Sequence, residues 1–165
     1  MIRVLALALL AAAAISSARA ENLRTYSNPR FGATAEYPSD WRPDPPPENG
    51  DGLVFRAPDG KATITISGIL NIADTPEEAM RDEEKGYDGQ TVTFHQHGRR
   101  WVIVSGTHDD AIFYRKSILV CRDQIWNQVY LDYPVARKTE FDALVAKVAA
   151  SLRFSGASEQ IPDCR

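Results

Sequence analysis

The residues best suited to bind a metal ion are the histidines, and all three lie between positions 95 and 108. His95 and His97 are two residues apart, so they would share one face of a strand, and neutral imidazole is a common zinc ligand. If Gly98-Arg99 is the two-residue turn of a hairpin, His97 lies opposite Arg100, whose charge would oppose a bound cation. We therefore expect ordinary polar sheet residues here, and a surface metal site at His95 and His97 is the alternative.

The third histidine, His108, lies about 20 Å further along the expected strand. It can pair with Asp110 as a catalytic base pairs with a carboxylate, but the sequence has no Gly-x-Ser-x-Gly nucleophile motif. It also lacks a Gly-x-Gly-x-x-Gly motif, a Walker loop and an EF-hand. Adjacent acids do not converge on one point of a helix or strand, so we expect the following pairs to face solvent: Glu77 and Glu78, Glu83 and Glu84, and Asp109 and Asp110. We predict no catalytic residue and no cofactor, and a hydrolase ranks behind metal binding.

The chain has two cysteines, Cys121 and Cys164. In an oxidising compartment an even number of cysteines favours a disulfide, which here would close a loop of about 44 residues and tie down the polar tail at residues 155–165. A redox or nucleophilic Cys121 is the alternative. The sequence has no Cys-x-x-Cys motif, however, and the residues around Cys121 are apolar. We predict a Cys121–Cys164 disulfide.

Residues 1–20 have the pattern of a secretory signal peptide, with Arg3, an apolar stretch over residues 4–15 and small residues up to an expected cleavage site after Ala20. Cleavage would remove Arg3 and Arg19, leaving 17 Lys and Arg against 22 Asp and Glu, a formal charge of −5. This acidic balance argues against nucleic-acid binding. No other apolar run reaches the roughly 18 residues that a membrane span needs. We expect a periplasmic or secreted protein without a membrane span.

Alternation of polar and apolar residues predicts a chain made mainly of strands. The clearest strand is 61–68, where Thr and Ser alternate with Ala and Ile. The preceding Pro58-Asp59-Gly60 is typical of a tight turn, because Pro presets φ, Asp bonds its own backbone and Gly accepts a positive φ. The expected strands are 32–37, 53–57, 61–68, 91–97, 100–105, 111–121 and 125–132.

Two helices are expected. Thr75, followed by Pro and two Glu, is a typical helix start, and Gly86 should end that helix, whose acidic run at 82–84 is expected to face solvent. Residues 141–152 place apolar side chains three and four residues apart, with Thr139 as the expected cap. Because this apolar stripe must rest on the strands, we predict an α+β fold of one domain over residues 21–154.

Residues 42–52 are rich in Pro and Gly and are predicted to form a loop. Within it, Pro45, Pro46 and Pro47 would form a stiff extended stretch that can present itself, or the nearby Trp41, to a partner. A rigid spacer that shields a sheet edge is the alternative, and it is the one that we favour.

Three segments together resemble a known family. Tyr26-Ser27-Asn28-Pro29-Arg30-Phe31-Gly32, then Glu36-Tyr37-Pro38-Ser39-Asp40-Trp41, is similar to the opening of the PsbP-like fold. Residues 141–154, ending in Ser151-Leu152-Arg153-Phe154, are similar to that family's final helix and its Ser-aromatic end. The resemblance covers about residues 23–154, and the order of the segments carries it.

The resemblance implies an α-β-α sandwich, with a central antiparallel sheet and helices on both faces. It also implies function by binding, since the family includes the extrinsic protein of photosystem II, a Ran-binding nuclear factor and many bacterial secreted proteins of unknown role. No shared catalytic residues accompany the fold. We therefore expect a secreted or periplasmic, non-enzymatic binding or assembly module whose partner is an unknown protein or envelope component. Binding of a small ligand or metal through His95 and His97 is the alternative.

Overall fold

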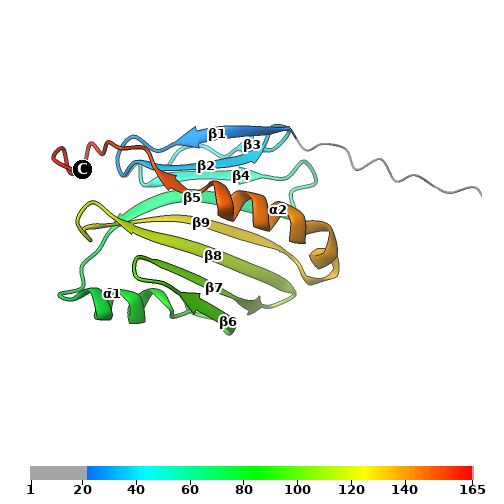
Figure 1. The fold of residues 1–165 in the computed structure, drawn as a ribbon. Helices are drawn as coiled ribbons and strands as arrows, with labels where there is room; N and C mark the ends of the chain where they lie inside the picture. The colour runs from blue at the N-terminus through cyan, green and yellow to red at the C-terminus, as the bar shows by residue number, and fades with distance from the viewer. Residues whose placement is uncertain (1–21, 165) are drawn as a thin grey trace, which may run out of the picture.

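The computed structural model describes residues 22–164, so the expected signal peptide at 1–20 lies outside the described residues. Most of the chain forms one antiparallel sheet with the strand order β3-β4-β5-β9-β8-β7-β6 (Figure 1). Its strands are β3 (Arg42–Pro43), β4 (Gly52–Arg56), β5 (Thr63–Leu70), β6 (Thr91–His97), β7 (Trp101–His108), β8 (Ala111–Val120) and β9 (Ile125–Pro134). The predicted central antiparallel sheet is therefore confirmed.

The two faces of this sheet are covered differently. One face carries the long helix α2 (Lys138–Ser151) together with a small sheet of β1 (Leu23–Ser27), β2 (Ala33–Pro38) and β10 (Arg153–Phe154). The short helix α1 (Pro76–Glu83) packs on the other face (Figure 1). Helices thus lie on both sides of the sheet, but the α-β-α description holds only in part because a second sheet shares the α2 face.

The main core lies between the large sheet and α2. Alternate residues of β5 and β9 point to this face, as the pleat of a strand requires, and the apolar stripe of α2 packs on them. The buried residues include Ile64, Ile66, Val129, Leu131, Tyr133, Phe141, Leu144 and Val148. This confirms that the final helix rests on the strands.

The hairpin of β6 and β7 differs from the expected one. His97 lies opposite Val102 rather than Arg100, and Gly98 bonds Trp101, so the turn residues are Arg99 and Arg100. Gly98 has no positive φ and does not serve the predicted type II′ turn. A Cβ at position 98 would instead collide with the indole of Trp101, and this close approach is what requires glycine.

The two helices begin for different reasons, one set by the local sequence and the other by the preceding strand. The predicted cap of α1 is confirmed, since the Thr75 hydroxyl accepts a hydrogen bond from the Glu78 amide at 3.1 Å. The predicted Thr139 cap of α2 is wrong, because a turn of 3-10 helix (Val135–Arg137) leads directly into Lys138 and no side chain caps the start. The preceding β9 therefore determines where α2 begins.

The predicted disulfide joins Cys121, after β8, to Cys164 in the tail. Further contacts hold the tail against the turn before β2, where the Ser158 hydroxyl donates to the Arg30 carbonyl at 2.7 Å and the Gln160 amide donates to the same carbonyl at 2.9 Å. Both cysteines are buried. The tail is thus pinned both by the disulfide and by hydrogen bonds.

Candidate functional site

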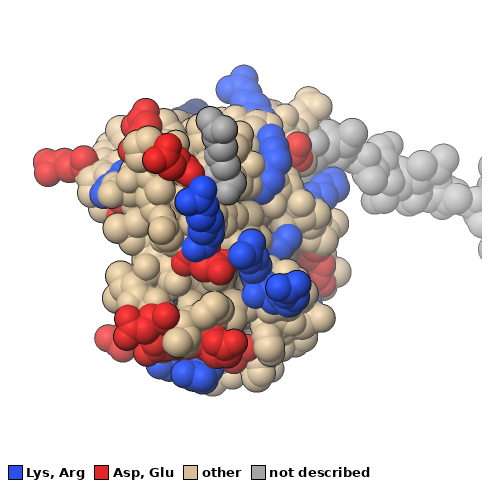
Figure 2. All heavy atoms as spheres, turned by 60° about the vertical axis from the view of Figure 1, so that its left-hand side comes forward, with Lys and Arg blue, Asp and Glu red and all other residues tan. Residues whose placement is uncertain are grey.

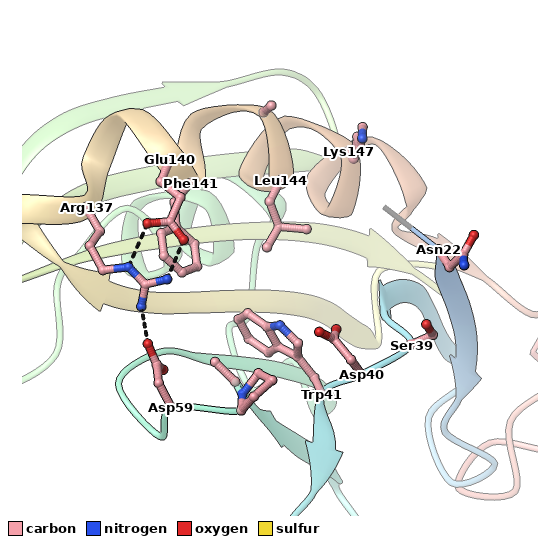
Figure 3. Close-up of a pocket in the computed structure, with 13 residues that line it drawn as sticks. Asn22, Ser39, Asp40, Trp41, Asp59, Arg137, Glu140, Phe141, Leu144 and Lys147 are labelled. Carbon is pink, nitrogen blue, oxygen red and sulfur yellow. Dashed lines mark hydrogen bonds and ion pairs between the residues drawn. The ribbon is translucent and has the colours of Figure 1, made fainter. Parts of the chain in front are cut away.

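A groove of about 750 Å³ lies between α2 and the turns that follow β2 and β4 (Figure 3). Its sides come from segments far apart in the sequence, so it exists only in the folded chain. The lining residues are Asn22, Ser39, Asp40, Trp41, Ala57, Pro58, Asp59, Arg137, Glu140, Phe141, Ala143, Leu144 and Lys147.

The floor of the groove is aromatic and aliphatic. The ring of Trp41 packs edge to face against Phe141, with ring centroids 6.3 Å apart, and Phe141 stacks on Tyr133 at 4.8 Å. Figure 3 shows Leu144 directed from α2 towards the Trp41 indole. Trp41 is only 8% exposed, so the core holds its ring rigidly while one part of it lines the groove. Such a surface can receive an apolar side chain.

Charged side chains close one end of the groove. Arg137 donates to Asp59 at 2.6 Å and also pairs with Glu140, as the dashed lines in Figure 3 show. Its guanidinium also lies over the Phe141 ring, 4.8 Å from the centroid. The backbone amide of Lys61, followed by Arg137, lowers the pKa of Asp59. The hydrogen bond from Arg137 lowers the pKa of Glu140, so both carboxylates stay ionised at neutral pH.

Near the other end, Asp40 presents a carboxylate to solvent on the β2 side of the groove. Within residues 22–164 it makes no ion pair. Ala143 and Leu144 on α2 separate this end from Arg137. The groove therefore combines an apolar floor, a closed ionic end and an unpaired acid on its rim.

The residues of the predicted partner-binding loop lie in different environments. Trp41 is buried and lines the groove, whereas Pro45, Pro46 and Pro47 are exposed. At the start of the loop, Pro43 lies in the edge strand β3, and the amide of Asp44 donates to the carbonyl of Val54 on β4 at 2.8 Å. The beginning of the loop thus covers a sheet edge, while partner binding by the three prolines stays a prediction.

The two histidines of the predicted metal site do share one face of β6, and both are exposed. Within residues 22–164, the acid that pairs with one of them is Glu84, whose Oε1 lies 3.6 Å from Nε2 of His97. No group of three or more His, Cys, Asp or Glu side chains able to hold a metal exists among the described residues. Metal binding here stays a prediction, which elemental analysis of the purified protein for stoichiometric zinc or manganese would test.

His108 pairs with Asp132 of β9, not with Asp110 as the hydrolase hypothesis required. The hydroxyl of Tyr130 lies 3.4 Å from the same carboxylate. The nearby Ser105 donates its hydroxyl hydrogen to the Phe113 carbonyl at 2.8 Å and is on the opposite face of β7 from His108. Ser105 is therefore not in position to act as a nucleophile with His108 as its base.

Several groove residues were not predicted from the sequence. Arg137 and Asp59 are 78 positions apart, and no motif links them. The turn at Asp59 was predicted, and its details are confirmed, since Asp59 accepts from the Lys61 amide at 2.9 Å and Gly60 has a φ of 73°. The sequence thus predicted the turn but not what the turn faces.

The elements and the groove define a class: a twisted antiparallel sheet with a C-terminal helix and a small sheet on one face, and a cleft beside that helix. The solution structure of cyanobacterial PsbP (CyanoP) from Synechocystis sp. PCC 6803 is similar, with a TM-score of 0.60 at 14% identity over 87% of this chain and 98% of that chain. The chain therefore has a PsbP-like fold, as the sequence motifs predicted.

A second structure, from Bacteroides thetaiotaomicron VPI-5482, matches 74% of this chain and 45% of that one at 20% identity, with a lower TM-score of 0.43. No model of a protein family matches the sequence. A search of curated proteins also finds no match. No helix in the described part of the chain is long and apolar enough to span a membrane.

Proposed function

We propose that this protein is an exported, non-enzymatic binding module that holds an extended segment of a partner protein in the groove beside α2. The observation that carries the proposal is the combination of a rigid aromatic floor, formed by Trp41 and Phe141, with charged groups at both ends. Export is supported by the Cys121–Cys164 disulfide, because disulfides persist in oxidising compartments, and by the signal-like pattern of residues 1–20.

The charges of the groove favour binding over catalysis. A general acid or base needs a pKa near the working pH, which burial usually provides. Asp59 and Glu140 are exposed, and hydrogen bonds lower the pKa of both carboxylates, so neither is suited to exchange a proton at neutral pH. Fixed charges of this kind instead set the orientation and the register of a bound segment.

The chemistry of the groove also indicates what the segment carries. An apolar side chain would cover the exposed parts of Trp41 and Leu144, because burying apolar surface is the main favourable term in association. A lysine or arginine of the partner would pair with Asp40. The carboxylates of Asp59 and Glu140 are already bonded to Arg137, so Asp40 is the acid that is open to a new ion pair.

The test uses a substitution that fills the groove without touching the core. Ala143 is exposed on α2 and lines the groove, so Ala143→Arg places a long side chain in it. Ala146→Arg is the matched control, because Ala146 is exposed on the same helix and does not line the groove. The purified mature protein is panned against a library of displayed random peptides, and enriched peptides are titrated by fluorescence anisotropy.

We expect enriched peptides to contain an apolar and a basic residue, and we expect Ala143→Arg to abolish their binding while Ala146→Arg preserves it. Asp40→Asn should weaken binding of the same peptides. A second arm replaces residues 43–47 with a Gly/Ser linker. If that replacement abolishes binding and Ala143→Arg does not, the proline loop and not the groove is the binding surface. If no peptide is enriched, or if binding survives both changes, the proposal is wrong.

A further inference from the structure

The two edges of the large sheet differ in how well they are protected. One edge is β3, which is two residues long and contains Pro43, so it offers little backbone for pairing. The other edge is β6, which has seven residues and forms the outermost strand in Figure 1. Six of these seven side chains are exposed. The edge at β6 is therefore longer and more exposed than the edge at β3.

The backbone groups of β6 that face outwards can be identified from the ladder. The Gly98 amide donates to the Trp101 carbonyl at 2.9 Å, which makes these two residues a hydrogen-bonded pair. In an antiparallel ladder such pairs alternate with pairs whose N–H and C=O groups point away from the partner strand. The register shows that His97 and His95 occupy the second kind of position, so their backbone groups point to the open edge. Within residues 22–164, no group forms a hydrogen bond with these outward backbone groups of His95 and His97.

Part of β6 also lacks the usual protection of an edge. Lysine, proline and inward-pointing charges normally prevent strands from pairing at an edge. Residues 91–97 contain none of these and are uncharged when their histidines are neutral. The irregularity of the ladder between Val92 and Phe94 protects the first part of the strand, as a β-bulge does, so the unprotected stretch runs from Phe94 to His97. Phe94 is 50% exposed, and burying its ring against a partner would favour association.

Charge differs between the two ends of this edge. Arg99 and Arg100 form the turn at the C-terminal end of β6. Arg100 pairs with Asp123, and Glu84 lies 3.6 Å from His97, whereas Arg99 makes no ion pair in the described structure. Figure 2 shows Lys and Arg side chains in the middle of the face that it presents, with Asp and Glu side chains beside them. At the other end, Thr91 pairs with Thr107, so the acids of the next turn, Asp109 and Asp110, lie nearby. Together with Asp88, which precedes the strand, they make this end acidic, and within the described residues none of the three acids forms an ion pair.

We propose that two copies of this chain associate through β6, as antiparallel neighbours related by a two-fold axis. The antiparallel arrangement places the unpaired Arg99 of each strand beside the acidic end of the other, whereas a parallel arrangement would place Arg99 beside Arg99. Outward backbone groups of His95 and His97 would form the new ladder, so the sheets of both subunits become continuous. The surface is the same on both copies, as a two-fold interface requires.

The groove beside α2 is lined by other residues, so this inference does not depend on the proposed function. The test is sedimentation equilibrium of the purified mature protein, for which we expect a dimer in reversible exchange with monomer. His95→Pro should abolish the dimer, because proline removes an outward N–H and leaves the bonds to β7 intact. Circular dichroism establishes that the variant is folded.

Charge reversal tests whether the strand that pairs with β6 belongs to a second copy of this chain. Arg99→Glu should raise the dimer dissociation constant roughly tenfold, because the two-fold axis brings the reversed charge beside the acidic end twice. Adding Asp110→Arg to the same chain should restore the wild-type value, which is expected only when the strand pairs with another copy of itself. Lys61→Glu, in the turn before β5, is the control with the same change in net charge.

Two results would overturn the proposal. One is a wild-type protein that is monomeric at every concentration. This holds even if β6 binds extended peptides of other proteins and His95→Pro abolishes that binding, because the partner is then not a second copy of this chain. The other is a dimer that none of the β6 variants affects, which would place the interface elsewhere.

Discussion

The guanidinium of Arg115 on β8 and the carboxylate of Glu83 at the end of α1 form an ion pair, with 3.1 Å between Nε and Oε1. The Arg115 side chain is 2% exposed and that of Glu83 is 12% exposed. Ser117 and Gln128 donate to the same carboxylate oxygen at 2.6 and 2.8 Å, and Arg115 also donates to the Lys85 carbonyl at 2.8 Å. One buried polar cluster therefore holds the end of α1 to the sheet.

Removing one member of this pair should be costly. Arg115→Met leaves the Glu83 carboxylate buried without its counter-ion, and breaking a buried pair in this way typically costs about 3–5 kcal/mol. The free energy of unfolding is measured by urea titration, with Arg24→Met as the control at an exposed arginine that makes no ion pair in the described structure. The control should change stability by no more than about 0.5 kcal/mol. A loss for Arg115→Met as small as that of the control would contradict the prediction.

The same cluster predicts a dependence on pH. Burial raises the pKa of Glu83 despite the opposing effect of Arg115. The folded state therefore holds this proton more tightly than the unfolded state does, and the resulting contribution to stability is fully present below the unfolded pKa and is lost as pH rises through the folded pKa. Urea titrations of the wild type and Glu83→Gln from acid to neutral pH should show the wild type losing stability relative to the variant as pH rises. If the wild type instead gains stability relative to Glu83→Gln as pH rises, the raised pKa of Glu83 is wrong.

The positions of the strands were predictable because the alternation of polar and apolar residues is a local property of the sequence. The strand 91–97 was expected with the bounds that the structure has, yet its hairpin partner was placed two residues out of register. The reason is that Gly98 was interpreted through turn chemistry, whereas its role is to admit the Trp101 ring. A contact between side chains cannot be predicted from turn preferences alone.

The main feature that the sequence analysis did not predict is the buried ion pair. Glu83 was expected to face solvent because acids flank it, but it is the one acid of that run that turns to the sheet. The signal that pointed to it lies elsewhere, in Arg115, which shares a strand face with Phe113 and Leu119 and so must find a partner in the core. The groove shows the same limit, since Trp41 and α2 were predicted separately but their proximity depends on the tertiary fold.

The disulfide gives a prediction about both chemistry and stability. Denatured but unreduced mature protein should have no free thiol, because Cys121 and Cys164 are joined. Cys164→Ser should lower the free energy of unfolding by about 4 kcal/mol, from the loss of a constraint on the unfolded chain, and should expose the tail to proteases. The reduced wild type is the control and should behave as the variant does. Two thiols in the unreduced protein would refute the prediction.

The last prediction concerns Tyr130, whose hydroxyl accepts a hydrogen bond from Gln90 at 2.8 Å and lies 3.4 Å from the carboxylate of Asp132. Burial, followed by the charge of Asp132, raises the pKa of Tyr130 from 10.0 to about 12. Its contribution to stability is fully present below pH 10 and is lost as pH rises towards 12, because the unfolded state releases the proton first.

An NMR titration of protein labelled at the tyrosine ζ carbon, with Tyr130→Phe to assign the signal, measures this pKa directly. Asp132→Asn should lower it by removing the neighbouring charge, while Gln90→Leu should raise it by removing the hydrogen bond that favours the phenolate. A wild-type midpoint near that of free tyrosine would mean that Tyr130 is open to water, and the cluster with Asp132 and His108 would then have to be revised.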